Sequence, residues 1–149
     1  IYQNPVEQIP EFQFLTEREW LSVADAGLET ERFSNEDEFR RAMEGLRFQA
    51  EMRFGAHVQG ALKQYSMANN GQFPPDLPSL MPFCESDVGA LLQQVYEIKP
   101  ASLLPKTTFE NLPIERPEWV VVRKVRVNSN STSRLAICVN ALSYWQSQP

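Results

Sequence analysis

The side chains able to do acid–base or nucleophilic chemistry are few in this chain of 149 residues. His57 is its one imidazole, and a catalytic histidine works with a nucleophile and a third group that orients the ring. No serine or cysteine stands at a spacing typical of such a set. We therefore interpret His57 as a core or boundary residue of a helix. A pair of catalytic carboxylates has no recognisable spacing in a sequence. An enzyme with such an acidic site therefore remains an alternative, and it is the least favoured class.

Two cysteines could form a disulfide, and three acidic residues in loops could bind a cation. Cys84 and Cys138 could form a disulfide, although two unpaired and mostly buried thiols are the simpler interpretation. Asp76, Glu85 and Asp87 lie close together in the sequence and could collect a cation, but helix capping explains them more simply. One histidine and two cysteines are too few for a zinc site of the Cys/His type. The sequence therefore predicts no cofactor and no metal.

The composition is that of an ordinary globular chain, with 42% hydrophobic and 22% charged residues. Its net charge of −5 argues against a nucleic-acid partner, which needs a clustered cationic surface. Acids dominate residues 1–38 and 76–115, and bases dominate 39–75 and 116–149. We interpret this as intramolecular complementarity between an acidic front segment and a basic C-terminal sheet, with a field that steers a partner as the alternative. No apolar run is long enough to span a membrane, and the opening at Ile1 is typical of a mature form or of a fragment that has lost a leader or anchor.

The first part of the chain is expected to form an arm and a short helix. Residues 1–15 carry two prolines and no helical period, which predicts an extended arm that packs Phe12 and Phe14, or an ordered tail of a longer protein. Thr16 and Glu19 match a capping box, so a helix should follow and end at a glycine. The side chains expected to face inward, and the terminal glycine, are Trp20, Leu21, Ala24 and Gly27.

The strongest pattern in the chain predicts one long helix over residues 35–69, about 50 Å in length. Mostly apolar side chains recur every three or four positions and form a single stripe. They are Phe39, Met43, Leu46, Ala50, Phe54, His57, Ala61, Tyr65 and Ala68, widened by Phe48, Val58 and Leu62. Asn70 and Gly71 tolerate the left-handed conformation that ends a helix. Close packing or a bend is indicated by three internal glycines, Gly45, Gly55 and Gly60.

The remaining segments predict a small sheet reached through irregular connections. Four prolines indicate that residues 72–83 form a loop that lies on a core, and Ser86 is expected to cap a short helix through Val95. The sheet is expected to contain a brief strand at Tyr96–Ile98, an irregular link over 99–118, and a hairpin over 119–140 built from strands 119–127 and 134–140. The predicted fold is α+β, a long helix packed on a small antiparallel meander, with an arm over 1–15 and a single domain over 16–149.

Part of this pattern resembles bacterial pseudopilins of type II secretion. The helix ending Ala61-Leu62-Lys63-Gln64-Tyr65, the run Asn69-Asn70-Gly71-Gln72-Phe73-Pro74, and Leu77 and Leu80 carry the resemblance. The stretch from Ala61 to Asn140 also resembles pilin-like C-terminal domains of uncharacterised bacterial proteins, through Tyr96-Glu97-Ile98, a tryptophan-led strand and a final strand that begins Ser133-Arg134. The match covers roughly half of the chain. It implies a pilin-like fold, a role in protein interaction, and a bacterial location outside the cytoplasm, in the periplasm.

The sequence departs from the pseudopilin pattern in two places. The first half of the predicted helix is charged where the family is apolar, with arginines at Arg40, Arg41, Arg47 and Arg53. Major pseudopilins bind calcium near a C-terminal loop, but the loop over 128–133 has no acidic residue, so no calcium site is predicted. The resemblance therefore supports the fold more than a role in secretion.

These observations favour a non-catalytic, pilin-like structural or protein-interaction domain whose long helix contacts a protein partner or a second copy. The alternative is a soluble regulatory or ligand-binding domain of a larger protein that uses the 72–83 loop as a pocket wall. Phe73 is expected to fold back against Tyr65, and Arg123 to pair with an acid of the front segment. The predicted partner or ligand surface consists of Tyr65, Phe73, Leu77, Phe83, Arg123 and Arg126.

Overall fold

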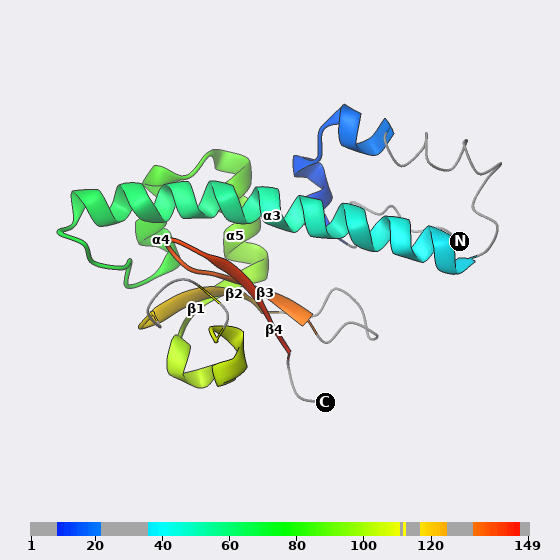
Figure 1. The fold of residues 1–149 in the computed structure, drawn as a ribbon. Coiled ribbons are helices and arrows are strands. Elements are labelled where there is room, and N and C mark those ends of the chain that lie inside the picture. Colours follow the sequence, from blue (N-terminus) through cyan, green and yellow to red (C-terminus); the bar gives the residue numbers. More distant parts are fainter. Residues whose placement is uncertain (1–8, 22–35, 111, 113–116, 125–132, 147–149) are drawn as a thin grey trace. The chain divides into compact units, whose positions relative to one another are not determined.

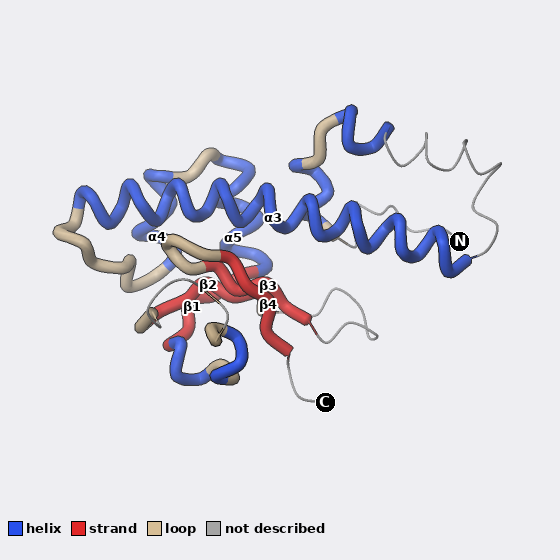
Figure 2. Tube along the Cα trace, viewed as in Figure 1, coloured by secondary structure: helices blue, strands red, loops and turns tan. Residues whose placement is uncertain are grey.

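The chain folds into an α+β structure, as the sequence predicts (Figures 1 and 2). The computed structural model describes residues 9–21, 36–110, 112, 117–124 and 133–146. The chain divides into two compact units, residues 1–54 and 55–149, which we call the N-terminal unit and the sheet unit. The division falls inside α3 (Glu36–Ala68), whereas the sequence predicts an arm over 1–15 followed by a single domain.

Helix α3 confirms the long helix predicted over residues 35–69. It ends in the predicted manner, because Asn70 has φ of 57° and Gly71 has φ of 80°. The amide of Gly71 donates to the carbonyl of Ser66 over 2.8 Å, the long-range bond of a Schellman motif. Asparagine and glycine adopt this left-handed conformation at low cost, so the chain can reverse immediately after the helix.

The N-terminal unit folds a short segment against the first half of α3. Residues 10–14 form the 3-10 helix η1 (Pro10–Phe14), so the expected extended arm is wrong for this stretch. Pro10 starts the turn with its fixed φ, and the amide of Phe12 donates to the carbonyl of Ile9 over 2.9 Å. The small core of this unit contains Phe12, Leu15, Leu46 and Ala50, with Ile9, Trp20 and Met43 packed against it. The expected packing of Phe14 is also present, since its ring centroid lies 5.4 Å from that of Phe54.

The capping box predicted at Thr16 is confirmed. The amide of Glu19 donates to the Thr16 hydroxyl over 3.3 Å, and the Thr16 amide donates to the Glu19 carboxylate over 2.6 Å. Residues 17–21 are helical, but Leu21 is exposed, so its expected inward position is wrong. Ala24 and Gly27, expected on the same helix, lie outside the described residues.

The sheet unit contains a four-stranded antiparallel meander in the order β1-β2-β3-β4. Its register places Ile98 opposite Val121, Val121 opposite Ile137, and Ile137 opposite Leu142. Three of its strands were predicted within a few residues, and the fourth was missed. The strands are β1 (Tyr96–Pro100), β2 (Trp119–Arg123), β3 (Ser133–Ile137) and β4 (Leu142–Gln146). The predicted strand positions 125–127 lie outside the described residues.

Both faces of the central strands are covered. Residues 55–68 of α3 lie on one face, where a Cβ atom added to Gly55 would lie 2.8 Å from Cδ2 of Leu142. The link after β1 covers the other face through two short 3-10 helices, η3 (Ala101–Leu103) and η4 (Lys106–Thr108). The buried residues of that second face are Ala101, Leu104, Phe109, Val120, Val122, Ala136, Cys138 and Ala141. Cys138 therefore faces away from Ile137, as strand alternation predicts.

The three glycines of α3, for which the sequence predicts close packing or a bend, have different surroundings. Gly55 has Leu142 against its open side, so close packing is confirmed there. At Gly45 and Gly60, an added Cβ would meet nothing within 4 Å. Packing among the described residues therefore explains one of the three glycines.

The proline-rich segment is more regular than predicted. It contains α4 (Leu77–Leu80) and η2 (Met81–Phe83), and α5 (Ser86–Val95) follows. The expectation of an irregular loop is wrong because each of these short helices places a proline in its first turn, where the missing amide donor costs nothing. Ser86 is the first residue of α5, not its cap, and the cap position belongs to Glu85, whose side chain makes no capping bond. Within the described ranges, no helix has the length and apolar character needed to cross a bilayer.

Candidate functional site

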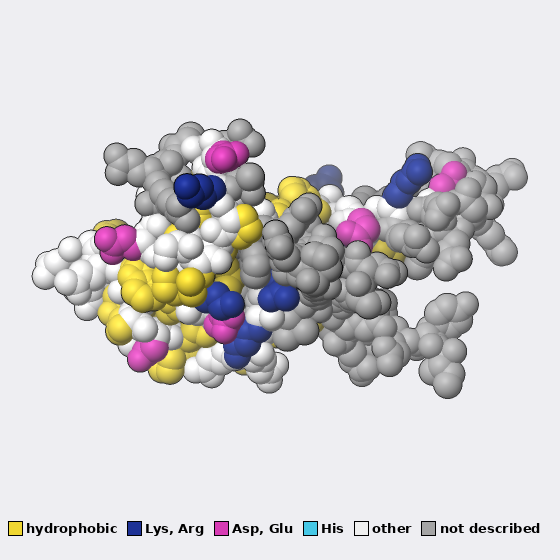
Figure 3. Space-filling view, turned by 90° about the horizontal axis from the view of Figure 1, so that it is seen from below, with side chains coloured by type: hydrophobic (Ala, Val, Ile, Leu, Met, Phe, Trp, Pro, Cys, Tyr) yellow, Lys and Arg dark blue, Asp and Glu magenta, His cyan; other side chains and the backbone are white. Residues whose placement is uncertain are grey.

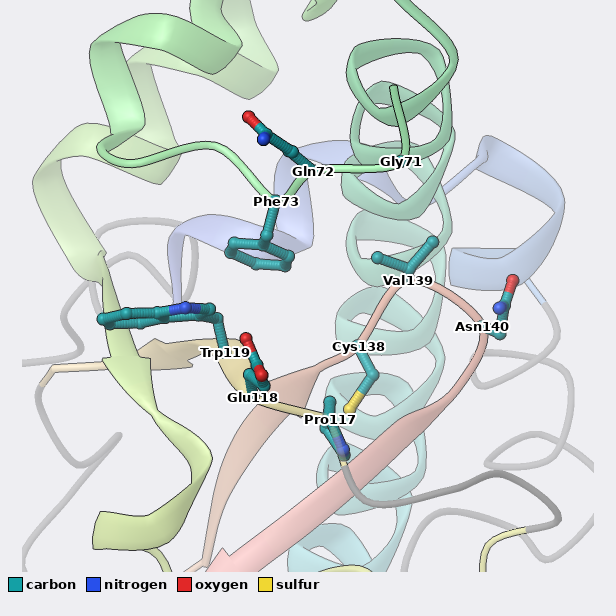
Figure 4. A pocket seen from close by; sticks show the side chains of 9 residues that line it. All are labelled: Gly71, Gln72, Phe73, Pro117, Glu118, Trp119, Cys138, Val139 and Asn140. Carbon is teal, nitrogen blue, oxygen red and sulfur yellow. The ribbon is translucent and has the colours of Figure 1, made fainter. Parts of the chain in front are cut away.

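The sheet unit contains a pocket of about 740 Å³ beside the C-terminal end of α3 (Figure 4). Three segments that are far apart in the sequence form it: the exit from α3, the start of β2, and the turn between β3 and β4. Its lining residues are Gly71, Gln72, Phe73, Pro117, Glu118, Trp119, Cys138, Val139 and Asn140. A volume of this size is typical of sites for a small ligand or for several side chains of a partner.

The first wall, residues 71–73, is fixed by the cap of α3. The Asn69 side chain donates to the carbonyl of Tyr65 over 2.9 Å, and the amide of Gln72 donates to the carbonyl of Asn69 over 3.1 Å. Pro74 follows and is buried. A residue before proline is restricted to extended conformations, so Phe73 leaves the turn in a defined direction. Figure 4 shows its ring pointing into the pocket, on the side where Trp119 and Glu118 lie.

The second wall is the start of β2. Trp119 is paired with Pro100 of β1, and the carbonyl of Glu118 accepts a 2.9 Å hydrogen bond from the amide of Ala101. These bonds hold the backbone that carries the indole of Trp119 and the carboxylate of Glu118. Both side chains are exposed, Trp119 to 43%.

The third wall is the turn between β3 and β4. The amide of Cys138 donates to the carbonyl of Ala141 over 2.8 Å, which closes the turn. The carbonyl of Cys138 accepts a 3.1 Å hydrogen bond from the side chain of Gln59 on α3. Each wall of the pocket is thus tied to a regular element by at least one hydrogen bond, so the pocket exists before any ligand arrives.

The lining is suited to recognition. Two aromatic rings offer apolar contact area, and the side chains of Gln72 and Asn140 offer amide donors and acceptors. Burial raises the pKa of the Cys138 thiol to about 11, so this sulfur is an uncharged thiol at neutral pH. Cys84 and Cys138 are free cysteines, in agreement with the simpler of the two predictions.

Among the predicted surface residues that the structure describes, Phe73 is the one that lines the pocket. It was expected to fold back against Tyr65, but the ring that Tyr65 meets edge to face is Phe83, with centroids 5.7 Å apart. Leu77 begins α4 and is partly buried. The predicted aromatic cluster therefore separates into a Tyr65–Phe83 pair and a pocket residue.

Of the two predicted arginines, one belongs to the described residues, and it does not line the pocket. Arg123 closes β2 and is buried, and its expected pairing with an acid of the front segment stays a prediction. Arg126 lies outside the described residues. In the space-filling view, hydrophobic side chains gather on one face of the sheet unit, with basic and acidic side chains scattered among them (Figure 3).

The lone histidine is exposed, so its placement on the buried stripe of α3 is wrong. Val58, one position further along the helix, is fully buried and takes the inner place. A step of one residue turns a helix by about 100°, which is enough to carry His57 to the solvent side.

The loop acids act locally. The Asp76 carboxylate caps α4 by accepting from the Ser79 hydroxyl over 2.6 Å and from the Ser79 amide over 2.9 Å, and these bonds lower the pKa of Asp76. Asp87 accepts from the amide of Val88 over 3.0 Å. Within the part of the chain that the structure describes, no three metal-ligating side chains come together.

Sequence reasoning missed most of the pocket, including Glu118, Trp119 and Asn140. The sequence signal available was a proline, an acid and a tryptophan in succession at the start of a strand, which places an aromatic side chain at the end of a sheet. Scans of the chain against protein-family models, curated proteins and solved structures find no match. The resemblance to pseudopilins therefore stays a prediction.

Proposed function

We propose that this chain is a non-catalytic, pilin-like domain that binds a protein partner, and that the pocket of the sheet unit is a recognition site. The observation that carries the proposal is the pocket itself, with three walls whose backbones are held by hydrogen bonds and two aromatic rings in its lining. A preformed site loses little conformational entropy on binding.

The lining supports a protein partner as the ligand. Tryptophan and other aromatic residues are enriched at the energetic centres of protein interfaces, where they fill or line pockets. Trp119 is 43% exposed in the free chain, so a partner can still bury a large part of its indole. Amide side chains at the rim, such as Gln72 and Asn140, supply hydrogen bonds that orient a bound backbone.

Selection from a random peptide library displayed on phage tests this proposal. We expect enriched peptides whose affinity falls at least tenfold in Trp119→Ala and in Phe73→Ala, since removing an interface anchor costs about 2 kcal/mol or more. Leu103→Ala, at an exposed apolar position of the same unit outside the pocket lining, is the control and should leave the affinity unchanged.

Failure to enrich any peptide, or enriched peptides that bind Trp119→Ala and Phe73→Ala as tightly as the unaltered chain, would contradict the pocket as a protein-recognition site. Amide correlation spectra of each variant establish that the sheet unit is still folded. A loss of affinity then reflects the pocket and not the fold.

The long helix offers a second surface for the same function, a protein partner or a second copy of the chain. Phe48 is 54% exposed in the N-terminal unit, and Met67 is 86% exposed in the sheet unit. Sedimentation velocity over a range of concentrations measures self-association directly. Self-association through α3 requires a dimer that dissociates in Phe48→Glu or Met67→Glu, and a monomer at millimolar concentration excludes it.

A ligand-binding domain is the second candidate function, because Gln72 and Phe73 of the proline-rich segment do line the pocket. A thermal-shift screen of small molecules separates it from the first. A compound that raises the melting temperature of the unaltered chain but not of Phe73→Ala would favour a small ligand.

A further inference from the structure

The charge of the pocket lining is one-sided. Glu118 is the one acidic or basic residue of the described lining, and burial raises the pKa of the Cys138 thiol to about 11. Its carboxylate lies beside the indole of Trp119, and Phe73 faces the same space (Figure 4). A carboxylate next to aromatic faces is the environment that attracts an organic cation, because the ring quadrupoles and the negative charge act in the same direction.

The strand beside this wall, β1, has one basic residue, and this residue is already paired elsewhere. Lys99 of β1 forms an ion pair with Glu97 of the same strand over 3.1 Å. Strand alternation places Lys99 with Val120 on the face opposite to Trp119. The carboxylate of Glu118 therefore faces a pocket to which its neighbouring strand brings no positive charge.

We propose that the pocket accepts an arginine side chain of the partner, with the guanidinium stacked on Trp119 and Phe73 and paired with Glu118. This inference rests on the proposed function and names the chemistry of the group recognised. A guanidinium is planar and weakly hydrated, so it stacks on aromatic faces and keeps its hydrogen-bond donors free for a carboxylate. The volume of about 740 Å³ leaves room for the residues flanking the arginine.

Two short peptides test the inference, and they differ in one side chain, which is charged in one peptide and neutral in the other. N-acetyl-Gly-Arg-Gly-amide carries the cation, and the same peptide with citrulline is its neutral isostere. Titration of each peptide, followed by the indole N–H signal of Trp119, gives the affinities. We expect the arginine peptide to bind about fivefold to thirtyfold more tightly, from the combined cation–π and ion-pair contributions.

Two acid-to-amide variants sharpen the result. Glu118→Gln should remove most of the preference for arginine, and Glu110→Gln, an exposed acid of the same unit outside the pocket lining, should leave it unchanged. Raising the salt concentration should weaken the binding of the arginine peptide and leave the affinity of the citrulline peptide unchanged. Phe73→Leu should weaken both peptides, because it removes a stacking face and keeps the charge.

Equal affinities for arginine and citrulline, or an arginine preference that persists in Glu118→Gln, overturns the inference. Absence of any shift of the Trp119 signal with either peptide overturns it as well. Failure of the inference is distinguishable from failure of the proposed function: phage-selected peptides that depend on Phe73 and Trp119 but contain no arginine refute the cation and retain the pocket.

Discussion

The two units of this chain bury very different groups against the same helix. In the sheet unit, α3 turns apolar side chains inward, with Val58, Ala61 and Leu62 almost fully buried. In the N-terminal unit, ionisable side chains are buried together with the apolar ones: Glu11, Arg47 and Glu51. Arg47 donates from Nε to a carboxylate oxygen of Glu51 over 3.1 Å. The sheet unit is therefore held mainly by hydrophobic burial, with Arg123 as its buried charged side chain among the described residues. The N-terminal unit depends in addition on a buried ion pair.

This difference gives a physical meaning to the charged first half of the helix. Arg53 pairs with Glu19, which comes from the acidic N-terminal segment, and Arg47 pairs with Glu44 and Glu51 of its own helix. From the sequence alone, these charges of α3 could be assigned to a protein partner. In the structure, part of them form ion pairs within the N-terminal unit. Complementarity inside the N-terminal unit therefore accounts for part of the charge on this half of the helix.

The largest effect is expected from breaking the buried pair of the N-terminal unit. Arg47→Ala leaves the Glu51 carboxylate without this cation, and losing one partner of a buried pair costs about 3–5 kcal/mol. We expect the amides of residues 46–54 to lose protection from hydrogen exchange, while the strands of the sheet unit keep theirs.

Arg41→Ala, at an exposed position of the same helix, is the control and should change little. If Arg47→Ala leaves the exchange of residues 46–54 unaltered, the buried pair does not stabilise the N-terminal unit. The buried charges would then make no difference to the stability of the two units.

The matched experiment in the sheet unit removes apolar volume. Leu62 is almost fully buried, so Leu62→Ala should lower the free energy of unfolding by about 2–5 kcal/mol. Urea denaturation followed by circular dichroism measures the change. Met67→Ala, on an exposed methionine of the same helix, should stay within about 0.5 kcal/mol of the unaltered chain. A similar loss for both variants would contradict the assignment of Leu62 to the core.

Glycine variants of α3 are expected to have smaller effects of unequal size. Gly60→Ala should stabilise by about 0.5–1 kcal/mol, because the added methyl group meets open space and alanine favours the helix. Gly55→Ala should gain less or lose stability, because Leu142 must move. In a Leu142→Ala background the two substitutions should become more alike, and a double-mutant cycle measures this coupling. Equal gains in the unaltered background would show that Gly55 is not closely packed.

The smallest effects concern two carboxylates, one in each unit. The amide of Thr16 and the neighbouring Arg53 lower the pKa of Glu19 below 4.5, and the hydroxyl and amide of Ser79 lower that of Asp76 below 3.8. Because both pKa values fall on folding, the stabilisation is complete above those ordinary values and is lost as the pH falls through the folded ones. Glu19→Gln and Asp76→Asn retain capping ability, so each should flatten the acid limb of the melting temperature. An unchanged acid limb would contradict these caps.

The sequence predicts much of the fold because its local signals agree with the packing. The stripe of α3, the reversal at Asn70 and Gly71, and the β-branched run after Trp119 are all readable from short stretches. The strand β4 has two aromatic residues that favour a strand, but it is only five residues long and has no β-branched side chain, so its pairing with β3 is what makes it a strand.

The pocket could not be predicted in the same way. Phe73, Glu118 and Asn140 are separated by tens of residues, and only the sheet register and the cap of α3 bring them to one place. Phe73 was selected as a surface residue from a local pattern, but its neighbours in the pocket depend on tertiary structure. Likewise, the helical period alone places His57 on the buried stripe. In the folded chain Val58 faces inward and His57 is exposed, which depends on how the helix packs on the sheet.

The central claim is that the sheet unit presents a preformed recognition pocket, and hydrogen exchange of the free chain tests it most directly. The amides of Gly71, Gln72, Ala101 and Cys138 donate the hydrogen bonds that hold the three walls. The account predicts that all four exchange at least a hundredfold more slowly than unprotected amides, a protection of about 3 kcal/mol. Exchange of these four amides at unprotected rates, with the central strands still protected, would show that the pocket is not a fixed site.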